Sequence, residues 1–364
     1  MRIGLVIYGD LSYTSGGFLY DRKVVERLEA GGDEAVIISL PWRRYGQHLL
    51  DNFSPRLYRE LVDRNLDLLV EDELNHPSLF LMNRWLKRRT KVPIVAIVHH
   101  LRWRERHPSV MKAFYRSVEH WYLRGLDGWV SVSKTTQQDV ISLGGREGPS
   151  RVCRPGGNRW QNLPGTEEIR IRAESGGPLR LVFLGNAIPR KGLHTLIEAV
   201  MSLPEGCCTL NVIGHLDTLP DYVAGIHARL EENSWRDRVG FAGAISGEQV
   251  GEALRAADVL VVPSAYEGYG IVYLEGMAFG LPAIGGKDGA AREIIREGEN
   301  GYLVDYGDAV TLASRIRNLS EDRALLGKMS AAARRHYDAQ STWENTTDCV
   351  RNFLYEISAN AIIR

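Results

Sequence analysis

Residues 258–286, DVLVVPSAYEGYGIVYLEGMAFGLPAIGG, contain an apolar run, a polar loop, a helical stretch and a second apolar run in succession. The run DVLVVPS has the composition of a strand that is buried on both faces, as in a parallel sheet. The stretch IVYLEGMAFG is expected to form a helix that ends at Gly280 and Pro282, which are common stop signals. This succession is typical of an α/β fold.

Two carboxylates, Glu267 and Glu275, lie eight positions apart in this stretch. Glu267 falls in the loop that follows the strand, and Glu275 falls in the second turn of the expected helix. A buried carboxylate is costly without a partner, so each needs one. Glu275 could accept hydrogen bonds from a diol such as ribose. The alternative is that Glu267 caps the helix and Glu275 lies on a solvated face.

The loop between the strand and the helix has the composition of a phosphate-binding turn. Its glycines would let the backbone approach a ligand closely, and the first amides of the helix would present a positive terminus. The residues concerned are Gly268, Gly270, Ile271 and Val272.

Apolar strands alternate with helical stretches in both halves of the chain, which predicts two doubly wound α/β units. Ligands of such open sheets bind beyond the carboxyl ends of the strands. The expected strands are RIGLVIY, EAVIISL, LDLLVED, PIVAIVHH and LDGWVSVS in the first half, and LRLVFLG, CTLNVIG, RVGFAG, VLVVPS and LPAIGG in the second.

The length of 364 residues favours two domains, because a single core rarely grows past about 250–300 residues. Turn residues in RPGGNRW and AESGGP place the boundary between the two strand sets. We therefore expect domains at residues 1–165 and 166–340. The segment 341–364 is expected to be a closing helix.

The composition is that of a soluble globular protein, with 44% apolar and 25% charged residues. No apolar run approaches the roughly 18 residues of a spanning helix, and the first residues lack the apolar core of a signal peptide. The cysteines show no paired framework or metal spacing, so reduced thiols in a cytoplasmic protein are expected. They are Cys153, Cys207, Cys208 and Cys349.

The net charge is zero but unevenly distributed. Residues 1–160 carry 25 Lys+Arg against 18 Asp+Glu, a balance of +7, which leaves 20 against 27, or −7, for the remainder. This asymmetry indicates either an anionic partner for the first half or ordinary surface variation. No nucleic acid is expected as a partner.

The stretch 110–125, VMKAFYRSVEHWYLRG, is expected to be an aromatic helix with basic neighbours. With the basic stretch RWLKRRTK at 84–91, it could dock peripherally on the cytoplasmic face of an anionic membrane. The alternative is an amphipathic helix packed on the core. Apolar residues expected near one face are Val110, Phe114, Trp121 and Tyr122, and the basic residues lying elsewhere are Lys112, Arg116 and Arg124.

Residues 263–286 resemble the E-x7-E region of family 4 retaining glycosyltransferases. Further similarity lies in LVFLGNAIPRKGLHTLIEAV and GAAREIIREGENGYLV, and weaker marks are SGG at 15–17, VSVSKTTQQDV and RPGGN. The resemblance implies the GT-B fold, with two Rossmann-like domains facing a cleft and a C-terminal helix that crosses back to the first domain. The first domain would bind the acceptor, and the second would bind a nucleotide diphosphate-sugar.

The resemblance also implies roles for particular residues. Glu275 would bind the ribose hydroxyls, Glu267 would lie against the donor sugar, and Lys191 would neutralise the leaving diphosphate. Glu267 and Lys191 are therefore candidate catalytic residues. The donor-binding set implied is Gly16, Gly17, Asn186, Arg190, Lys191, Glu267, Gly268, Tyr269, Gly270, Ile271, Val272 and Glu275.

The sequence departs from the family at Asn186, where an arginine usually faces the diphosphate. An amide donates hydrogen bonds but neutralises no charge, so we expect weaker donor binding or an altered donor. Arg190 is commonly present beside that arginine and is not an obvious replacement. Gly16 and Gly17 match a loop that nears the donor phosphates. The absence of G-x-G-x-x-G there argues against a dinucleotide oxidoreductase.

His99 and His100 end an expected strand, where a family histidine touches the donor sugar, and both are candidate catalytic residues. Strand alternation means that only one of them can face the cleft. The acids Glu71 and Asp72 at another strand end are candidate acceptor-binding residues, with helix capping as the alternative. A metal is not expected, since enzymes of this fold generally work without one.

We therefore expect a retaining hexosyltransferase of carbohydrate biosynthesis that needs no cofactor beyond its nucleotide-sugar donor. It would transfer the sugar by front-face displacement to a hydroxyl of a glycan, lipid-linked or small-molecule acceptor. The alternatives are a disaccharide phosphorylase or nucleotide-sugar isomerase of the same fold, or a non-catalytic remnant that binds sugar nucleotides.

Overall fold

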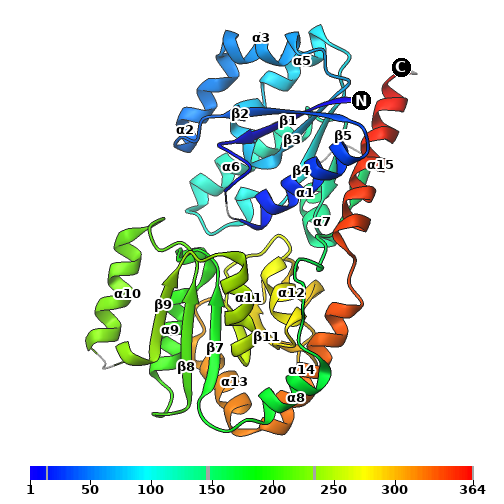
Figure 1. Ribbon diagram of the computed structural model, residues 1–364. Helices are drawn as coiled ribbons and strands as arrows, with labels where there is room; N and C mark the ends of the chain where they lie inside the picture. Colours follow the sequence, from blue (N-terminus) through cyan, green and yellow to red (C-terminus); the bar gives the residue numbers. More distant parts are fainter. Residues whose placement is uncertain (14, 145–147, 233–234, 363–364) are drawn as a thin grey trace. The chain divides into compact units, whose positions relative to one another are not determined.

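A computed structural model describes residues 1–13, 15–144, 148–232 and 235–362 (Figure 1). The chain forms two compact units. Unit 1 comprises Met1–Gly156 together with the segment from Ser341 onward, and unit 2 comprises Gly157–Gln340. The predicted first boundary lies after residue 165, whereas unit 1 ends at Gly156, before the segment RPGGNRW is complete.

Unit 1 contains a six-stranded parallel sheet in the order β2-β1-β3-β4-β5-β6. Its central strands β3 and β4 are buried along their whole length, as a sheet covered on both faces requires, and most of their residues are leucine, isoleucine, valine or alanine. The strands are β1 (Arg2–Tyr8), β2 (Glu34–Leu40), β3 (Leu68–Asp72), β4 (Ile94–Val98), β5 (Gly128–Ser131) and β6 (Ser150–Val152). The short edge strand β6 was not predicted, because three half-exposed residues show no apolar pattern.

The helices of unit 1 cover both faces of this sheet (Figure 1). They are α1 (Gly16–Ala30), α2 (Tyr45–His48), α3 (Pro55–Asp63), α4 (His76–Leu79), α5 (Met82–Arg89), α6 (Ser109–Leu123), α7 (Lys134–Ser142) and α15 (Trp343–Ile362), with short 3₁₀ turns η1 (Leu49–Phe53), η2 (Glu73–Asn75) and η3 (Arg102–Arg104).

Unit 2 repeats the architecture with a parallel sheet in the order β12-β11-β10-β7-β8-β9. Its strands are β7 (Leu179–Leu184), β8 (Cys208–Ile213), β9 (Val239–Gly243), β10 (Val259–Val262), β11 (Ala283–Gly286) and β12 (Gly301–Val304). Its helices are α8 (Thr166–Glu174), α9 (Leu193–Met201), α10 (Pro220–Glu232), α11 (Gly247–Ala256), α12 (Ile271–Ala278), α13 (Ala309–Glu321) and α14 (Arg323–Asp338), with 3₁₀ turns η4 (Pro189–Lys191), η5 (Arg236–Arg238) and η6 (Ala290–Glu293).

Each sheet has one point at which the strand order reverses. In unit 1 it lies between β1 and β3, and in unit 2 it lies between β7 and β10. Loops that leave the carboxyl ends of such neighbouring strands diverge to opposite faces and open a crevice for ligands. The sites are therefore expected at these two places.

The C-terminal helix α15 packs on unit 1, as the resemblance implied (Figure 1). The ring of Trp343 meets that of Tyr20 edge to face at 5.9 Å between centroids. The Arg351 Nε donates to Asp33 Oδ2 at 2.8 Å, and the Arg27 Nε donates to Asp348 Oδ1 at 2.5 Å. These contacts fix α15 against α1.

The expectation of four free thiols is wrong for two of them. Cys153, which follows β6, and Cys349 in α15 form a disulfide with their Cα atoms 6.0 Å apart. They lie 196 residues apart in sequence, so no spacing pattern could reveal the pair. Cys207 and Cys208 are free.

The aromatic residues of α6 do not share one face. Tyr122 is fully buried in the core of unit 1, whereas Val110 is 80% exposed and Phe114 and Trp121 are about half as exposed as that. The helix therefore packs through one face on the core and presents a second apolar strip outward. Core packing and outward exposure were predicted as alternatives, because helical spacing alone does not separate two adjacent apolar strips.

Candidate functional site

The loops after β7 and β10 bring Lys191 and Glu267 together at the reversal point of the unit 2 sheet. The Lys191 Nζ donates to Glu267 Oε1 at 2.6 Å, and the Ser264 Oγ donates to the same oxygen at 2.6 Å. Glu267 is only 6% exposed. The partner that a buried carboxylate needs is thus a lysine from the neighbouring strand's loop.

Charge decides the ionisation of this pair. Burial by itself raises the pKa of Glu267, but the positive charges of Lys191 and Arg190 outweigh it and hold that pKa below its usual value. Burial lowers the pKa of Lys191, and the carboxylate of Glu267 opposes that effect. Glu267 is therefore an anion at neutral pH, beside a cation that can approach a phosphate.

Close backbone packing holds the two loops together. Gly192 has a φ of +74°, and a Cβ on it would lie 2.2 Å from the carbonyl oxygen of Pro263, so only glycine fits. The Ala265 N–H donates to the Arg190 carbonyl at 2.7 Å. The Arg190 guanidinium donates to the Tyr266 carbonyl at 3.1 Å, so Arg190 braces the loop that carries Glu267.

Helix α12 begins directly after this loop. Gly270 precedes it with a φ of +93°, and a Cβ there would lie 2.6 Å from the Tyr273 ring. Ile271 and Val272 are the first two residues of α12, and their amides belong to its positive end. Gly268 and the buried Tyr269 complete the turn, so the residues of the predicted phosphate-binding loop are contiguous in space.

Glu275 lies in the second turn of α12, is 6% exposed and forms an ion pair with Arg159. Burial raises the pKa of Glu275, and the charge of Arg159 opposes the rise. The Arg159 guanidinium also lies 4.6 Å from the centroid of the Trp160 ring. Sequence reasoning missed Arg159, because the segment RPGGNRW was interpreted as a turn and its first five residues as a mark of the family, and no role was given to its second arginine.

Asn186 follows β7 at the same sheet edge. The loops after β7 and β8 touch there, since a Cβ on Gly214 would lie 2.2 Å from the Gly185 carbonyl oxygen and 3.1 Å from the Asn186 nitrogen. A Cβ on Gly185 would lie 3.7 Å from the Lys191 Cε. Asn186 is half-buried and directly follows the glycine over which the Lys191 side chain passes.

In unit 1, the two histidines at the end of β4 turn to different partners. The His99 Nε2 lies 3.2 Å from Asp21 Oδ1, and a Cβ on Gly17 would lie 3.5 Å from the His99 ring. The His100 Nε2 lies 3.0 Å from Glu105 Oε1. The structure therefore joins His99 to the glycine loop, in which Gly16 is the first residue of α1.

The predicted acceptor-binding acids are also separated by strand alternation. Glu71 is completely buried and accepts a hydrogen bond from Asn83 Nδ2 at 3.0 Å. Asp72 instead lies with Asp21 and His99, in a group whose candidate ligand atoms are all within 4.8 Å of one another. The next acid, Glu73, forms a similar group with His76 and Glu119. Both groups have the spacing that could hold a cation.

A cavity of about 250 Å³ opens at the carboxyl ends of the unit 1 strands. Glu73 and His100 line it, whereas Glu71, Asp72 and His99 do not. Its lining residues are Tyr8, Trp42, Arg43, Tyr45, His48, Glu73, Leu74, His76, Pro77, His100, Arg102 and Glu105.

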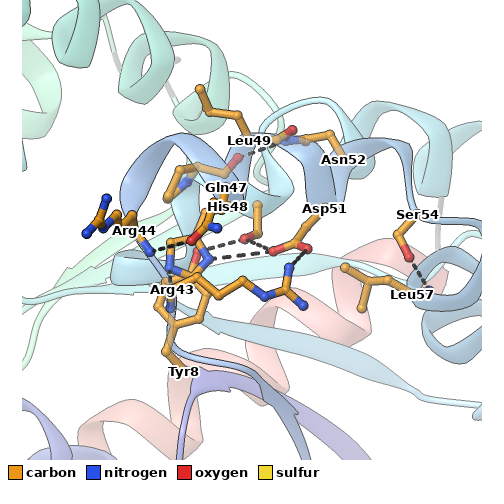
Figure 2. A network of polar contacts seen from close by, with 12 residues as sticks. Tyr8, Arg43, Arg44, Gln47, His48, Leu49, Asp51, Asn52, Ser54 and Leu57 are labelled. Carbon is orange, nitrogen blue, oxygen red and sulfur yellow. Dashed lines mark hydrogen bonds and ion pairs between the residues drawn. The ribbon is translucent and has the colours of Figure 1, made fainter.

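A polar network fixes one wall of this cavity, and Figure 2 shows most of it. The Tyr8 hydroxyl lies 2.7 Å from the Ser78 hydroxyl, which donates to Asp51 Oδ2 at 2.8 Å. The Arg43 guanidinium donates to Asp51 Oδ1 at 2.8 Å (Figure 2), and the His48 ring stacks on Tyr8 at 4.0 Å. The sequence offered no signal for this cavity, because its residues come from four separate segments of the chain.

The two parallel sheets, each with polar side chains at its reversal point, define the class of α/β proteins built from paired Rossmann-like units. Residues 165–336 match the family described as Glycosyl transferases group 1, and residues 14–158 match Glycosyltransferase Family 4. The phosphatidyl-myo-inositol mannosyltransferase of Mycobacterium leprae (strain TN) is 30% identical over 325 residues, 86% of this chain and 77% of that protein. The chain belongs to glycosyltransferase family 4, as its resemblance indicated, and is a glycosyltransferase.

The chain spans a smaller share of other relatives, 56% of the length of one and 36% of the length of another. Among solved structures, sucrose-phosphate synthase (tll1590) from Thermosynechococcus elongatus has a TM-score of 0.82 at 20% identity, covering 99% of this chain and 100% of that one. Anabaena Alr3699/HepE in complex with UDP-glucose has a TM-score of 0.79 at 19% identity, covering 98% and 100%. These similarities confirm the predicted GT-B fold.

Within the described ranges, no helix combines the length and the apolar character needed to cross a bilayer.

Proposed function

We propose that this chain transfers a hexose-type sugar, with retention of anomeric configuration, from a nucleotide diphosphate-sugar to an acceptor hydroxyl. One observation carries the proposal. Lys191 and Glu267 form a buried ion pair beside the N-terminus of α12, at the reversal point of the unit 2 sheet. A cation and a positive helix end at one sheet edge suit a diphosphate.

In the proposed reaction, the bond from the anomeric carbon to the diphosphate oxygen breaks and a bond to the acceptor oxygen forms on the same face. A phosphate oxygen takes the acceptor's proton, so the protein supplies no strong general base and no metal is needed. Lys191 stabilises the departing diphosphate, and Glu267 orients Lys191 and faces the sugar. Glu275 binds the ribose hydroxyls. These hydroxyls must either share the Glu275 carboxylate with Arg159 or replace Arg159 as its partner.

The names of the similar proteins support an activated hexose as donor, since one structure holds UDP-glucose and one relative is a mannosyltransferase. We propose that the donor is a nucleoside diphosphate hexose and that the acceptor binds to unit 1. We also propose a cytoplasmic location for this reaction.

A thermal-shift panel of UDP, GDP and ADP and their hexoses tests this proposal, because a ligand of the native state raises its stability by mass action. One nucleotide should raise the melting temperature of the wild type. Lys191→Met should lower the affinity for that nucleotide at least about tenfold, since a charge-assisted hydrogen bond contributes about 1.5–3 kcal/mol. The exposed Lys328 gives a matched control, Lys328→Met, which should bind normally.

With the best donor identified, transfer is assayed by the anomeric NMR signals of the product. An inverted product would contradict the retaining mechanism. Equal nucleotide binding by wild type and Lys191→Met would remove the basis of the proposed donor site.

We also propose that unit 1 contacts an anionic membrane surface. The outward strip of α6 exposes Val110, Phe114 and Trp121, and Arg84 of α5 lies 4.9 Å from the Trp121 ring centroid. Exposed basic residues lie on α6, directly after it and on α5, so charge attraction would add to apolar insertion. These residues are Lys112 and Arg116 of α6, Arg124 directly after it, and Arg84, Lys87, Arg88 and Arg89 of α5.

Sedimentation with vesicles of neutral lipid, with and without 30 mol% of an anionic lipid, tests the membrane proposal at low salt. The wild type should sediment only with anionic vesicles, and Phe114→Ser with Trp121→Ser should abolish binding. Ile141→Ser, which removes an exposed apolar side chain on α7, is the control and should bind as the wild type does. A wild type that stays in the supernatant would refute the proposal.

A further inference from the structure

Arg102 is a cation without an anionic partner inside the unit 1 cavity. It begins η3, just after β4, and its guanidinium lies 5.1 Å from the Tyr45 ring centroid and 4.9 Å from that of Tyr115. Its Nε is buried and makes no hydrogen bond. Among the residues that the structure describes, no carboxylate pairs with this guanidinium, so its desolvation is not offset by an ion pair.

The neighbouring arginines differ from Arg102 in this respect. Arg43, which also lines the cavity, is paired with Asp51 at 2.8 Å. Arg104, two residues along the same turn, is paired with Asp139 at 3.1 Å. Arginine presents a planar set of donors that fits carboxylate or phosphate oxygens in a two-pronged manner. Arg102 is therefore the arginine that is available to bind an anionic ligand in this cavity.

The acids of the cavity do not neutralise Arg102. Glu105 is paired with His100 at 3.0 Å and lies 3.6 Å from His107. Glu73 faces a histidine instead, with its Oε1 lying 3.3 Å from the His76 Nδ1. Its Oε2 is buried without a hydrogen-bond partner, which suits an incoming hydroxyl.

The rim of the cavity offers an aromatic face. Trp42 is 57% exposed, and its ring meets Tyr8 edge to face at 5.6 Å. A large exposed aromatic ring at a cavity mouth provides a flat surface for the C–H face of a sugar ring. The volume of about 250 Å³ is just below the roughly 300–1,000 Å³ of drug-sized pockets, so one ring fits.

We infer that this cavity binds the acceptor, and that the acceptor is a hydroxylated ring bearing one anionic group held by Arg102. This inference rests on the proposed transferase function and adds the acceptor's chemical class. A phosphate monoester and a carboxylate present the same oxyanion chemistry to a guanidinium, so both are included.

Calorimetric titration with glucose 6-phosphate, glucuronate and glucose tests the inference on the full chain. The wild type should bind at least one of the two anionic sugars at least about tenfold more tightly than glucose, as expected for a charge-assisted hydrogen bond. The anionic sugar that binds more tightly shows whether the anionic group of the acceptor is a phosphate or a carboxylate. Arg102→Gln should lose this preference, and Arg102→Lys, which keeps the charge but not the two-pronged geometry, should show an intermediate affinity.

Arg104→Gln is the matched control, because it removes the same charge from the same turn but from a residue that does not line the cavity. It should retain the preference within about twofold. Melting temperatures separate binding from packing. Without ligand, Arg102→Gln should be as stable as the wild type or more so, because it removes a poorly compensated cation.

Anionic sugars that bind no more tightly than glucose, or that bind Arg102→Gln as well as the wild type, would overturn the inference. So would a lower melting temperature of Arg102→Gln with unchanged sugar binding, which would mark Arg102 as a packing residue. Nucleotide binding is measured on the same samples. Its absence in the wild type would refute the donor site, and its presence leaves the sugar titrations to decide the acceptor class.

Discussion

Glu267 and Glu275 are equally buried, at 6% exposure, yet the pKa of the first lies below its usual value and that of the second lies above. Burial by itself raises the pKa of both carboxyl groups. Glu267 is compensated by two cations, Lys191 and Arg190, and by the Ser264 hydroxyl, whereas Glu275 has Arg159 alone. At the scale of single residues, the number of charged partners therefore decides which acid is firmly ionised.

The charge of His99 predicts that the stability of the protein depends on pH. The pKa of His99 is raised to about 9, because its contacts with Asp21, Asp72 and Glu73 outweigh burial, which alone would lower it. The stabilisation that this charge contributes is fully present below pH 6.5 and is lost as the pH rises through about 9. A rise in pKa from 6.5 to about 9 corresponds to at most about 3–4 kcal/mol.

The free energy of unfolding from urea titrations should therefore fall between pH 6.5 and 9.5, and His99→Gln should flatten the decline. His215→Gln, at an exposed histidine of unit 2, should leave the decline unchanged. Parallel pH curves for the wild type and His99→Gln would contradict this assignment.

Asn186 gives a prediction about donor affinity. Asn186→Arg adds a cation beside the strand end that carries Lys191, and should tighten the binding of a nucleoside diphosphate about tenfold by a charge-assisted hydrogen bond. Asn186→Gln, which keeps an amide, is the control. Unchanged affinity and turnover in Asn186→Arg would show that the missing arginine is not what limits donor binding.

At the scale of elements, helix α12 depends on the backbone of Gly270. The left-handed φ of +93° turns the chain from the Glu267 loop into the helix, and the Tyr273 ring fills the space where a side chain would begin. The Tyr273 hydroxyl in turn donates to the Val262 carbonyl at 2.8 Å, which ties α12 to β10. The positive helix end is thus positioned by the sheet itself.

Gly270→Ala should destabilise the protein by about 1–3 kcal/mol, because the residue is forced into the left-handed region against the Tyr273 ring. It should also weaken nucleotide binding. Gly225→Ala in α10 is the control, since a Cβ there meets nothing within 4 Å. That change should stabilise by up to about 1 kcal/mol, as alanine does in a helix. Denaturant unfolding measures both, and equal stability of the two variants would contradict the prediction.

At the scale of the whole molecule, the disulfide between Cys153 and Cys349 encloses all of unit 2 in the loop that it closes. It joins the end of the unit 1 sheet to α15. A crosslink between residues so far apart in sequence restricts the unfolded chain strongly. Helix α15 is thereby held on unit 1 by a covalent bond as well as by the Arg351–Asp33 ion pair.

Thiol titration of the oxidised protein in denaturant should find two free thiols, those of Cys207 and Cys208, and reduction should raise the number to four. Reduction should destabilise the protein by about 2–5 kcal/mol. Cys207→Ser should retain this sensitivity to reductant, and Cys349→Ser should lose it. Four free thiols before reduction would refute the crosslink.

Much of the fold could be predicted from the sequence, because strands buried on both faces are continuous apolar runs. The interior strands β4 and β10 were predicted in this way, whereas the half-exposed edge strand β6 was missed. Lys191 and Glu267 could each be placed in a loop after a predicted strand, and the structure brings their side chains within 2.6 Å. Their proposed roles remain predictions.

The sequence by itself determined the two parallel sheets and the loop from Glu267 to Val272, because apolar periodicity and glycine turns are properties of adjacent residues. Only the tertiary structure decided that Arg159 pairs with Glu275 across 116 residues, and that Cys153 meets Cys349. It also placed the Arg102 guanidinium 5.1 Å from the Tyr45 ring and 4.9 Å from the Tyr115 ring, with no ion pair to a carboxylate among the described residues. A buried charge or thiol takes whatever partner packing brings within reach, and packing joins residues from loops that lie far apart in the chain.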